Sequence, residues 1–391
     1  MVSKLLRQFK YVEIIGKAGI MMKKKRLHVA MLIGALGKGG TERVLVNLSD
    51  YLIGKGFQVT VVTQYQKENE YPLHPKAKRI ISDLTKEECS ESRILNFIRR
   101  FSKLRKIWKK ERPDVILSFI GKNNMMAILT SRFLKIPVAV AVRGDPMMEY
   151  YLGWMRLASK ILFRLADGVI LQTKQSFDFF PKAVRKKAII LKNPINPAFF
   201  IPRYEGEREK TIVAVGRMDE NKNHELLIRA FTGIAEKYPE YQLIIYGEGE
   251  LKEKLKELTA GLGMEGRISF PGAISNVQEA IYKAGVFVLP SNTEGVPNTL
   301  IEAMILGLTV IATDCPCGGP ADLIEHGTNG LLTQVGNVEQ MKDNLQKVLN
   351  NLQYSNELGM KALRTSDIYL PERVYKEWEA YLGSLPLRRK A

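Results

Sequence analysis

The chain repeats a pattern in which short apolar runs alternate with longer segments that have helical spacing. The first run covers residues 27–34 and leads into a glycine cluster, after which apolar residues recur every three or four positions from Thr41 to Gly54. That spacing is typical of a helix with one buried face, and glycine commonly ends such a helix. Further apolar runs occupy residues 57–63, 114–120, 137–143 and 168–173. The alternation predicts a parallel sheet covered by helices.

The alternation breaks near residue 193 and then starts again. Residues 193–210 hold three prolines followed by a charged run, a composition typical of a linker. Strand-like runs then return at residues 211–216, 241–247, 267–272, 286–291 and 309–314. We therefore predict an α/β protein with two doubly wound, Rossmann-like domains facing across a cleft, over residues 24–195 and 208–368. A last helix over 371–385 is expected to pack back on the first domain.

Length and composition agree with two globular domains. The chain has 391 residues, of which 45% are hydrophobic and 26% charged, and no apolar run reaches the length of a membrane span. Three cysteines, two of them separated by a single proline, fit reduced thiols better than a disulfide framework. Residues 1–23 precede the domain pattern. They are either an interfacial amphipathic segment or, as we favour, a non-native or upstream-start extension.

The basic residues are concentrated in the first half of the chain. Residues 1–200 contain 38 Lys and Arg against 15 Asp and Glu, a net charge of +23, whereas the whole chain carries +18. The remaining residues therefore carry a net charge of −5. A half with this excess is expected to meet an anionic partner, which leaves nucleic acid, an acidic membrane surface and a phosphorylated substrate open.

Two loops that follow predicted strands have the composition of anion sites. Residues 34–43 include Gly39 and Gly40 just before a helix, where the backbone can approach a phosphate; a tight turn without a ligand is the alternative. The glycines lack the G-x-G-x-x-G spacing of dinucleotide sites. Residues 216–223 contain Arg217 and Lys222, which suit a diphosphate.

A third loop, YGEGE at residues 246–250, is equally consistent with an ordinary turn and with a ligand contact. The fourth is the most informative. Glu294 precedes a predicted helix start at Pro297, and Glu302 lies inside that helix. The amides of Asn298, Thr299 and Leu300 would face a phosphate there. Either carboxylate alone could be a solvated surface group, but both together indicate a ligand that carries hydroxyl groups on each side of a phosphate.

The order of these motifs resembles the retaining, GT-B-fold glycosyltransferases with an E-x7-E motif, known as glycosyltransferase family 4. The matching segments are GGTER, GRMDENKN, YGEGE, PSNTEGVPNTLIEAMILG, TDCPCGGPADLI and HGTNGLL. The resemblance extends over about residues 24–385. It implies that the second domain binds a nucleotide-sugar and that no cofactor is needed.

The resemblance also implies roles for single residues. Arg217 and Lys222 would hold the donor diphosphate, Glu294 would contact the donor sugar, and Glu302 the ribose. Ile274, with its neighbour Ala273, would lie near the base, and Gly40 would approach the phosphates from the first domain. Because no two aspartates stand two positions apart, the metal-binding D-x-D motif is missing, and a metal-free mechanism is expected.

The sequence departs from many relatives in the first domain. Where those relatives have a histidine near the donor sugar, residues 138–145 end in Arg143, Gly144 and Asp145. Arg143 and Asp145 are therefore candidate contacts of donor or acceptor.

Residues 93–110 predict a basic amphipathic helix, in which apolar residues at helical spacing alternate with eight Lys and Arg. The helix either docks on an anionic membrane surface or packs its apolar face into the core. We expect the former, together with a cytoplasmic location at the inner face of the plasma membrane.

Together these features predict a retaining, metal-independent hexosyltransferase. It would move a hexose or N-acetylhexosamine from a UDP-sugar to a lipid-diphosphate or polysaccharide acceptor in cell-surface glycan synthesis. A sugar-nucleotide epimerase or a phosphorylase of related fold is the nearer alternative, although the sequence offers no candidate lysine for the pyridoxal phosphate that a phosphorylase needs. Nucleic-acid binding is the remote alternative, since no recognised nucleic-acid motif is present and it would leave Glu294 and Glu302 unexplained.

Overall fold

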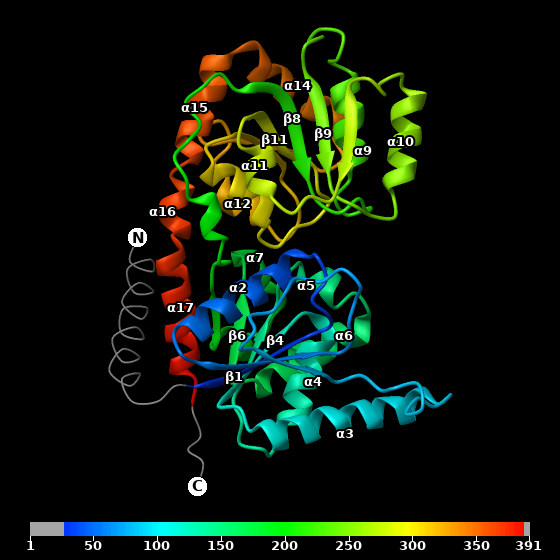
Figure 1. Ribbon diagram of the computed structural model, residues 1–391, viewed down its shortest axis with the longest axis vertical. Helices are drawn as coiled ribbons and strands as arrows, with labels where there is room; N and C mark the ends of the chain where they lie inside the picture. Colours follow the sequence, from blue (N-terminus) through cyan, green and yellow to red (C-terminus); the bar gives the residue numbers. More distant parts are fainter. Residues whose placement is uncertain (1–26, 387–391) are drawn as a thin grey trace. The chain divides into compact units, whose positions relative to one another are not determined.

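The computed structural model describes residues 27–386, which form two compact units (Figure 1). The first unit contains the described residues up to Pro194 together with those from Pro371 onward, and the second contains Ile195–Leu370. The chain therefore leaves the first unit at the proline-rich segment and returns to it through the last helix. The expectation for residues 1–23 lies outside the described part.

The first unit is built on a seven-stranded sheet in which every pair of neighbours is parallel. The strand order is β3-β2-β1-β4-β5-β6-β7. The strands are β1 His28–Ile33, β2 Gln58–Thr63, β3 Lys78–Ile81, β4 Val115–Phe119, β5 Val138–Ala141, β6 Gly168–Leu171 and β7 Ala188–Ile190.

Helices cover both faces of this sheet, because alternate residues of each strand point to opposite faces. Val29, Met31 and Ile33 of β1 pack with α2 (Gly40–Gly54) and α17 (Pro371–Ser384). Ala30 and Leu32 share the other core with three further helices. These are α3 Arg93–Glu111, α4 Gly121–Ser131 and α6 Gly153–Leu162. Shorter helices complete the unit, namely α5 Pro146–Glu149, α7 Lys174–Phe179 and α8 Lys182–Arg185.

The second unit repeats the plan with six parallel strands in the order β10-β9-β8-β11-β12-β13. The strands are β8 Glu209–Val215, β9 Gln242–Tyr246, β10 Ile268–Gly272, β11 Ala284–Leu289, β12 Thr309–Thr313 and β13 Leu331–Thr333. The helices are α9 His224–Thr232, α10 Lys252–Gly261, α11 Val277–Ile281, α12 Asn298–Ile305, α13 Gly319–Leu323, α14 Val338–Asn350, α15 Leu352–Ala362 and α16 Thr365–Tyr369.

The predicted fold class is confirmed, and each strand expected from an apolar run is present. The sequence pattern missed β3, β7 and β13, which have only three or four residues each. Edge strand β3 has no fully buried residue and contains Lys78 and Arg79. It therefore lacks the apolar signature on which the prediction relied.

The C-terminal helix α17 completes one core of the first unit. Val374, Trp378 and Leu382 are fully buried in the cluster that also contains β1. The Trp378 indole donates a hydrogen bond to the Lys192 carbonyl at 2.8 Å, and the ring of Tyr375 stacks on Tyr51 of α2 at 4.5 Å. Residues far apart in sequence thereby form one core.

Replacing Trp378 by alanine should lower the free energy of unfolding of the first unit by about 3–5 kcal/mol, because a fully buried ring leaves a cavity. Urea denaturation monitored by circular dichroism measures this change. Arg373→Ala on the same helix is the matched control, since its ion pair with Glu377 involves a side chain that is 62% exposed and should be worth under about 1 kcal/mol. Equal destabilisation by both changes would contradict the role given to Trp378.

Candidate active site

The strand order of the second sheet reverses between β8 and β11, which lie side by side although five elements separate them along the chain. Ligands of parallel α/β sheets bind at such a reversal, beyond the carboxyl ends of the strands. The loops that leave these two strands are residues 216–223 and 290–297. These are the loops in which the sequence places Arg217, Lys222 and Glu294.

Asparagine side chains tie the two loops together. The amide of Asn292 donates to the Asn221 carbonyl at 2.7 Å, and the Asn221 side chain donates to the Thr293 carbonyl at 3.0 Å. Asn223, which caps α9, also donates to the Asn292 side chain at 3.0 Å. Such bonds fix the two backbones against each other. The sequence analysis missed these asparagines, although their position in loops that follow strands was visible.

Lys222 and Glu294 meet across the reversal point. The Lys222 ammonium lies 2.5 Å from the Glu294 carboxylate, and the side chains are only 17% and 13% exposed. The Ser291 hydroxyl donates to the same carboxylate oxygen at 2.8 Å. This ion pair brings together two residues that the sequence placed in separate loops with separate roles. Ser291 is a member of the cluster that the sequence analysis did not identify.

Arg217 occupies a different environment. Its side chain is 70% exposed, and its guanidinium lies 3.1 Å from Asp219, an ion pair too exposed to fix it strongly. Its carbonyl is held by the ring of buried His224 at 3.2 Å. Burial and the nearby Lys222 ammonium lower the pKa of His224 to about 4, so the ring is neutral near pH 7 and donates to that carbonyl. The Arg217 backbone is therefore fixed while its guanidinium projects into solvent.

Helix α12 begins at Asn298, as predicted from Pro297. Its first intrahelical bond runs from the Ile301 amide to the Pro297 carbonyl, so the positive end of the helix dipole lies at the amides of Asn298, Thr299 and Leu300. Glu302 lies on α12 with an exposed fraction of only 1%. The predicted ribose contact of Glu302 is untested and stays a prediction.

Glycines allow neighbouring loops of this edge to touch. A Cβ atom on Gly319, at the start of α13, would lie 1.4 Å from the Gly295 carbonyl oxygen. A Cβ on Gly247, in the YGEGE loop, would lie 1.8 Å from the Gly216 carbonyl oxygen. Close backbone packing therefore accounts for Gly247 without a ligand. Ile274 is half-buried in the loop after β10, and its position near the base of the donor stays a prediction.

Gly39 and Gly40 lie in the first unit, where the chain enters α2 after β1. Gly39 is the N-cap residue, and its amide donates to the Gly37 carbonyl at 2.8 Å. A Cβ on Gly39 would lie 2.3 Å from the Glu42 carboxylate. The two glycines thus mark a helix start at the carboxyl edge of the sheet, as predicted, and their contact with donor phosphates remains a prediction.

Arg143 follows β5 at the same edge of the first unit and is buried, with an exposed fraction of 7%. Its guanidinium donates to the Asn193 side chain and lies 5.9 Å from the Trp378 ring centre. The Nε and Nη1 atoms are buried and have no hydrogen-bond partner in the described structure. Burial lowers the pKa of Arg143 to about 10, so the group is still cationic near pH 7. Asp145 accepts a hydrogen bond from the Met147 amide and caps α5.

Glu149 organises this loop, and the sequence analysis did not single it out. Its carboxylate accepts the amides of Arg143 at 2.6 Å, Gly144 at 2.7 Å and Gly121 at 3.1 Å. Burial raises the pKa of Glu149, whereas the three amide donors act in the opposite direction. Ile120, next to Gly121, has a φ of 67°, which is strained for a β-branched residue. One carboxylate thus holds the loops after β4 and β5.

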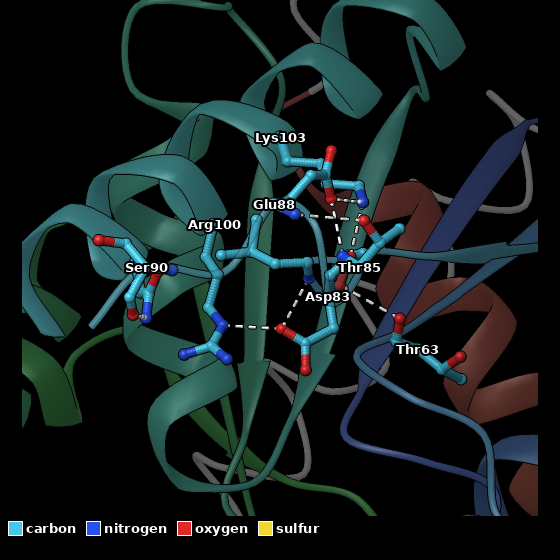
Figure 2. Close-up of polar contacts among 10 residues, drawn as sticks. Thr63, Asp83, Thr85, Glu88, Ser90, Arg100 and Lys103 are labelled. Atoms are coloured by element: carbon cyan, nitrogen blue, oxygen red, sulfur yellow. Dashed lines mark hydrogen bonds and ion pairs between the residues drawn. The ribbon is translucent and has the colours of Figure 1, made fainter. Parts of the chain in front are cut away.

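Helix α3 combines a buried end with a projecting end. Leu104 and Trp108 pack in the core, whereas Ile94, Phe97 and Ile98 are exposed. Core packing, the alternative to membrane docking, therefore holds for the C-terminal half of the helix, whereas docking of the helix on a membrane surface stays a prediction. Figure 2 shows the loop before the helix bracing it: Arg100 pairs with Asp83 at 2.7 Å and Lys103 with Glu88 at 2.8 Å.

Within residues 27–386, no group of three or more His, Cys, Asp or Glu side chains could hold a metal ion. No helix in the same range combines the length and the apolar composition that crossing a membrane requires.

Comparison with known proteins gives consistent matches over both units. The family described as "Glycosyltransferase Family 4" matches residues 38–199, and "Glycosyl transferases group 1" matches residues 199–364. An N-acetylgalactosaminyltransferase of Campylobacter jejuni, named for a diphospho-undecaprenol-linked acceptor, is 26% identical over 90% of this chain and 97% of that protein. The amylovoran biosynthesis glycosyltransferase AmsD of Erwinia amylovora is 24% identical over 90% of this chain and 98% of that protein.

Solved structures show the same fold. Anabaena Alr3699/HepE in complex with UDP has a TM-score of 0.76 and 17% identity, covering 92% of this chain and all of that one. WaaG, a glycosyltransferase of lipopolysaccharide biosynthesis, has a TM-score of 0.72 and 17% identity, covering 90% of this chain and 99% of that one. With its two parallel sheets and these matches, the chain is a hexosyltransferase that belongs to the GT-B glycosyltransferases of the family 4 kind.

Proposed function

We propose that this transferase moves a hexose or N-acetylhexosamine from a UDP-sugar to a lipid-diphosphate or glycan acceptor, with retention of anomeric configuration and without a metal ion. The observation that carries the proposal is the Lys222–Glu294 pair at the β8–β11 reversal, beside the first turn of α12. A cation, a carboxylate and a helix N-terminus at one edge match the phosphate and hydroxyl groups of a nucleotide-sugar.

The leaving diphosphate needs positive charge as its bond to the sugar breaks. Lys222 supplies a partly buried ammonium, α12 supplies amides and a helix dipole, and Arg217 supplies an exposed guanidinium that can turn toward the ligand. These groups would stabilise the developing charge in place of a metal ion. Glu294, held by Ser291, would accept hydroxyl groups of the donor sugar, and Glu302 those of the ribose.

The relatives of this chain support both the proposed donor and the proposed acceptor. Uridine nucleotides occupy related folds, as in Anabaena Alr3699/HepE with UDP-glucose, and the Campylobacter jejuni relative is named for a diphospho-undecaprenol-linked acceptor. The net charge of +23 over residues 1–200 suits such an anionic acceptor. We place Gly39, Gly40, Arg143 and Asp145 of the first unit toward the substrates, because they follow strands at its carboxyl edge.

We also propose peripheral attachment to the anionic inner face of the plasma membrane through α3. Several of its cations are engaged nearby: Arg100 and Lys103 pair with acids of the preceding loop, and Arg105 donates to the carbonyls of residues 130 and 132. Lys106, Lys109 and Lys110 are exposed on the last turns. These three lysines are therefore the part of α3 best placed to meet lipid headgroups.

Nucleotide selectivity is the first test. UDP should raise the melting temperature of the protein by several degrees, since a ligand at about a hundred times its dissociation constant adds about 2.7 kcal/mol to the folded state. Thermal-shift measurements with UDP, GDP, ADP, NAD and a short oligonucleotide provide the comparison. A response to NAD or the oligonucleotide without one to UDP would overturn the donor assignment.

Glu294→Gln should reduce sugar transfer by on the order of a hundredfold while UDP affinity changes little, because its carboxylate is assigned to the sugar and not to the nucleotide. Transfer kinetics and UDP calorimetry measure the two effects. Glu257→Gln, an exposed residue of α10, is the control and should leave both unchanged. If Glu294→Gln retained full transfer, its role as a sugar contact would be wrong.

Arg217→Ala and Lys222→Ala should each weaken UDP binding by about tenfold to a hundredfold and lower transfer as well, since each removes a charge-assisted bond to the diphosphate. Lys222→Ala also leaves the partly buried Glu294 carboxylate without its cation. The double variant Lys222→Ala/Glu294→Gln separates that secondary effect. Unchanged UDP affinity in both single variants would remove the diphosphate assignment.

Replacing Lys106, Lys109 and Lys110 by glutamine should reduce binding to phosphatidylglycerol-containing vesicles about a hundredfold, at about 1 kcal/mol per lysine near an acidic surface. Vesicle pelleting at physiological salt measures it. The control replaces three exposed lysines of the second unit, Lys237, Lys254 and Lys361. A wild-type protein that stayed wholly in the supernatant would refute membrane attachment through α3.

A further inference from the structure

Helix α6 is apolar on two different sides. Its inner side packs in the core through Met155, which is 1% exposed. Trp154, Leu157 and Ile161 face outward and are 61%, 62% and 51% exposed. A helix that packs one side on its own protein normally presents polar residues on the other. The outer side of α6 is therefore suited to a second apolar environment.

Exposed apolar residues also lie directly before and after α6 in the chain. Met147 and Met148 of α5 and Tyr151 of the connecting turn are exposed, as is Leu165 after α6. Scattered exposed apolar residues are common, but a run that extends over two consecutive helices marks a contact surface. Tryptophan and tyrosine within it are the residues enriched where a bilayer meets water. We refer to residues 147–165 as the α5–α6 surface.

Charge decides which occupant this surface fits. The one acid of the α5–α6 surface is Glu149, whose carboxylate accepts three backbone amides of neighbouring loops. The cations of the surface are Arg156, Lys160 and Arg164. Arg156 donates to the carbonyls of residues 150 and 151 and so fixes the turn between the helices. A symmetric contact with a second copy of the chain would oppose cations to cations. Apolar side chains flanked by cations match the acyl chains and anionic headgroups of a bilayer.

The α5–α6 surface lies next to the loop that contains Arg143 and Asp145. Helix α5 begins one residue after Asp145, so the surface starts directly at the loop of Arg143 and Asp145. Helices α3, α4 and α6 share one core on the same face of the sheet, as Figure 1 shows for the first unit. A bilayer in contact with α6 would therefore adjoin the loop assigned to donor or acceptor.

We infer that the α5–α6 surface inserts its Trp, Leu, Ile and Met side chains into the acyl boundary of a lipid bilayer. This gives the protein an apolar contact that is separate from the charge-dependent contact of α3. The inference rests on the proposed function only in that a lipid-linked acceptor would then reach the Arg143 loop from the membrane. Binding through this surface resists salt, because salt screens charges and strengthens apolar burial.

Tryptophan fluorescence tests the insertion directly. Trp108 and Trp378 are fully buried, so Trp154 is the accessible tryptophan of the described residues. Vesicles of equimolar phosphatidylethanolamine and phosphatidylglycerol with brominated acyl chains should quench wild-type emission, and Trp154→Phe should abolish the quenching. The measurement is made with the full chain. Unquenched wild-type emission on vesicles that pellet with the protein would overturn the inference.

A variant set tests the energy of the contact. Met148→Gln/Leu157→Gln/Ile161→Gln should weaken vesicle binding in about 1 M salt by about tenfold or more, because three apolar side chains no longer leave water. The control is Leu352→Gln/Met360→Gln/Ile368→Gln in the second unit, whose residues are 63%, 50% and 48% exposed against 60%, 62% and 51%. Equal binding of variant and wild type would overturn the inference.

Two further readouts separate competing explanations. Wild-type dimers in sedimentation experiments that the α5–α6 variant fails to form would show that a second copy covers the surface, and would overturn the inference. Transfer from UDP-sugars to a short, soluble diphosphate acceptor tests the proposed function alone. Salt-resistant insertion by a protein without such transfer would retain the α5–α6 contact and refute the substrate assignment.

Discussion

The reversal of strand order in the second sheet is the constraint on which the candidate site depends. Because β8 and β11 are neighbours and parallel, the segments that follow these two strands leave the sheet at the same edge and then continue into different helices. Ligands of parallel α/β sheets bind where strands diverge in this way, which makes loops 216–223 and 290–297 the candidate ligand contacts. Asparagine bonds fix these loops to each other, so the Lys222–Glu294 pair is held by backbone as well as by charge.

The ion pair also explains how a lysine and a glutamate can both be partly buried at this edge of the sheet. Each charge would be costly there without the other, and each has a proposed ligand group to meet when a nucleotide-sugar binds. The Ser291 hydroxyl gives the Glu294 carboxylate a second donor, which persists if Lys222 turns toward phosphate. Arg217 differs, since its exposed side chain needs little rearrangement to reach an anion.

In the first unit, too, the candidate residues lie at the carboxyl ends of the strands of its sheet. Glu149 gathers three amides and holds the loop that presents Arg143, while the apolar surface of α5 and α6 begins a few residues further on. The loop that we propose to contact the substrates is therefore followed directly by the residues that we propose to contact a membrane. Projecting residues of α3 and α6 belong to helices on one face of the sheet, which would let charge and apolar burial act together.

The sequence by itself determined the class of fold, because buried parallel strands must be apolar throughout and their helices amphipathic. It also located Arg217, Lys222, Glu294 and the start of α12, since glycine, proline and charge at strand ends are local signals. Short β3, β7 and β13 lacked such signals. Only the tertiary structure decided that Lys222 pairs with Glu294, that Glu149 binds the amides of two loops, and that the outer side of α6 faces solvent. Each of these features depends on which segments the strand order brings together. The hydrophobic periodicity of one segment does not predict which other segments will pack against it.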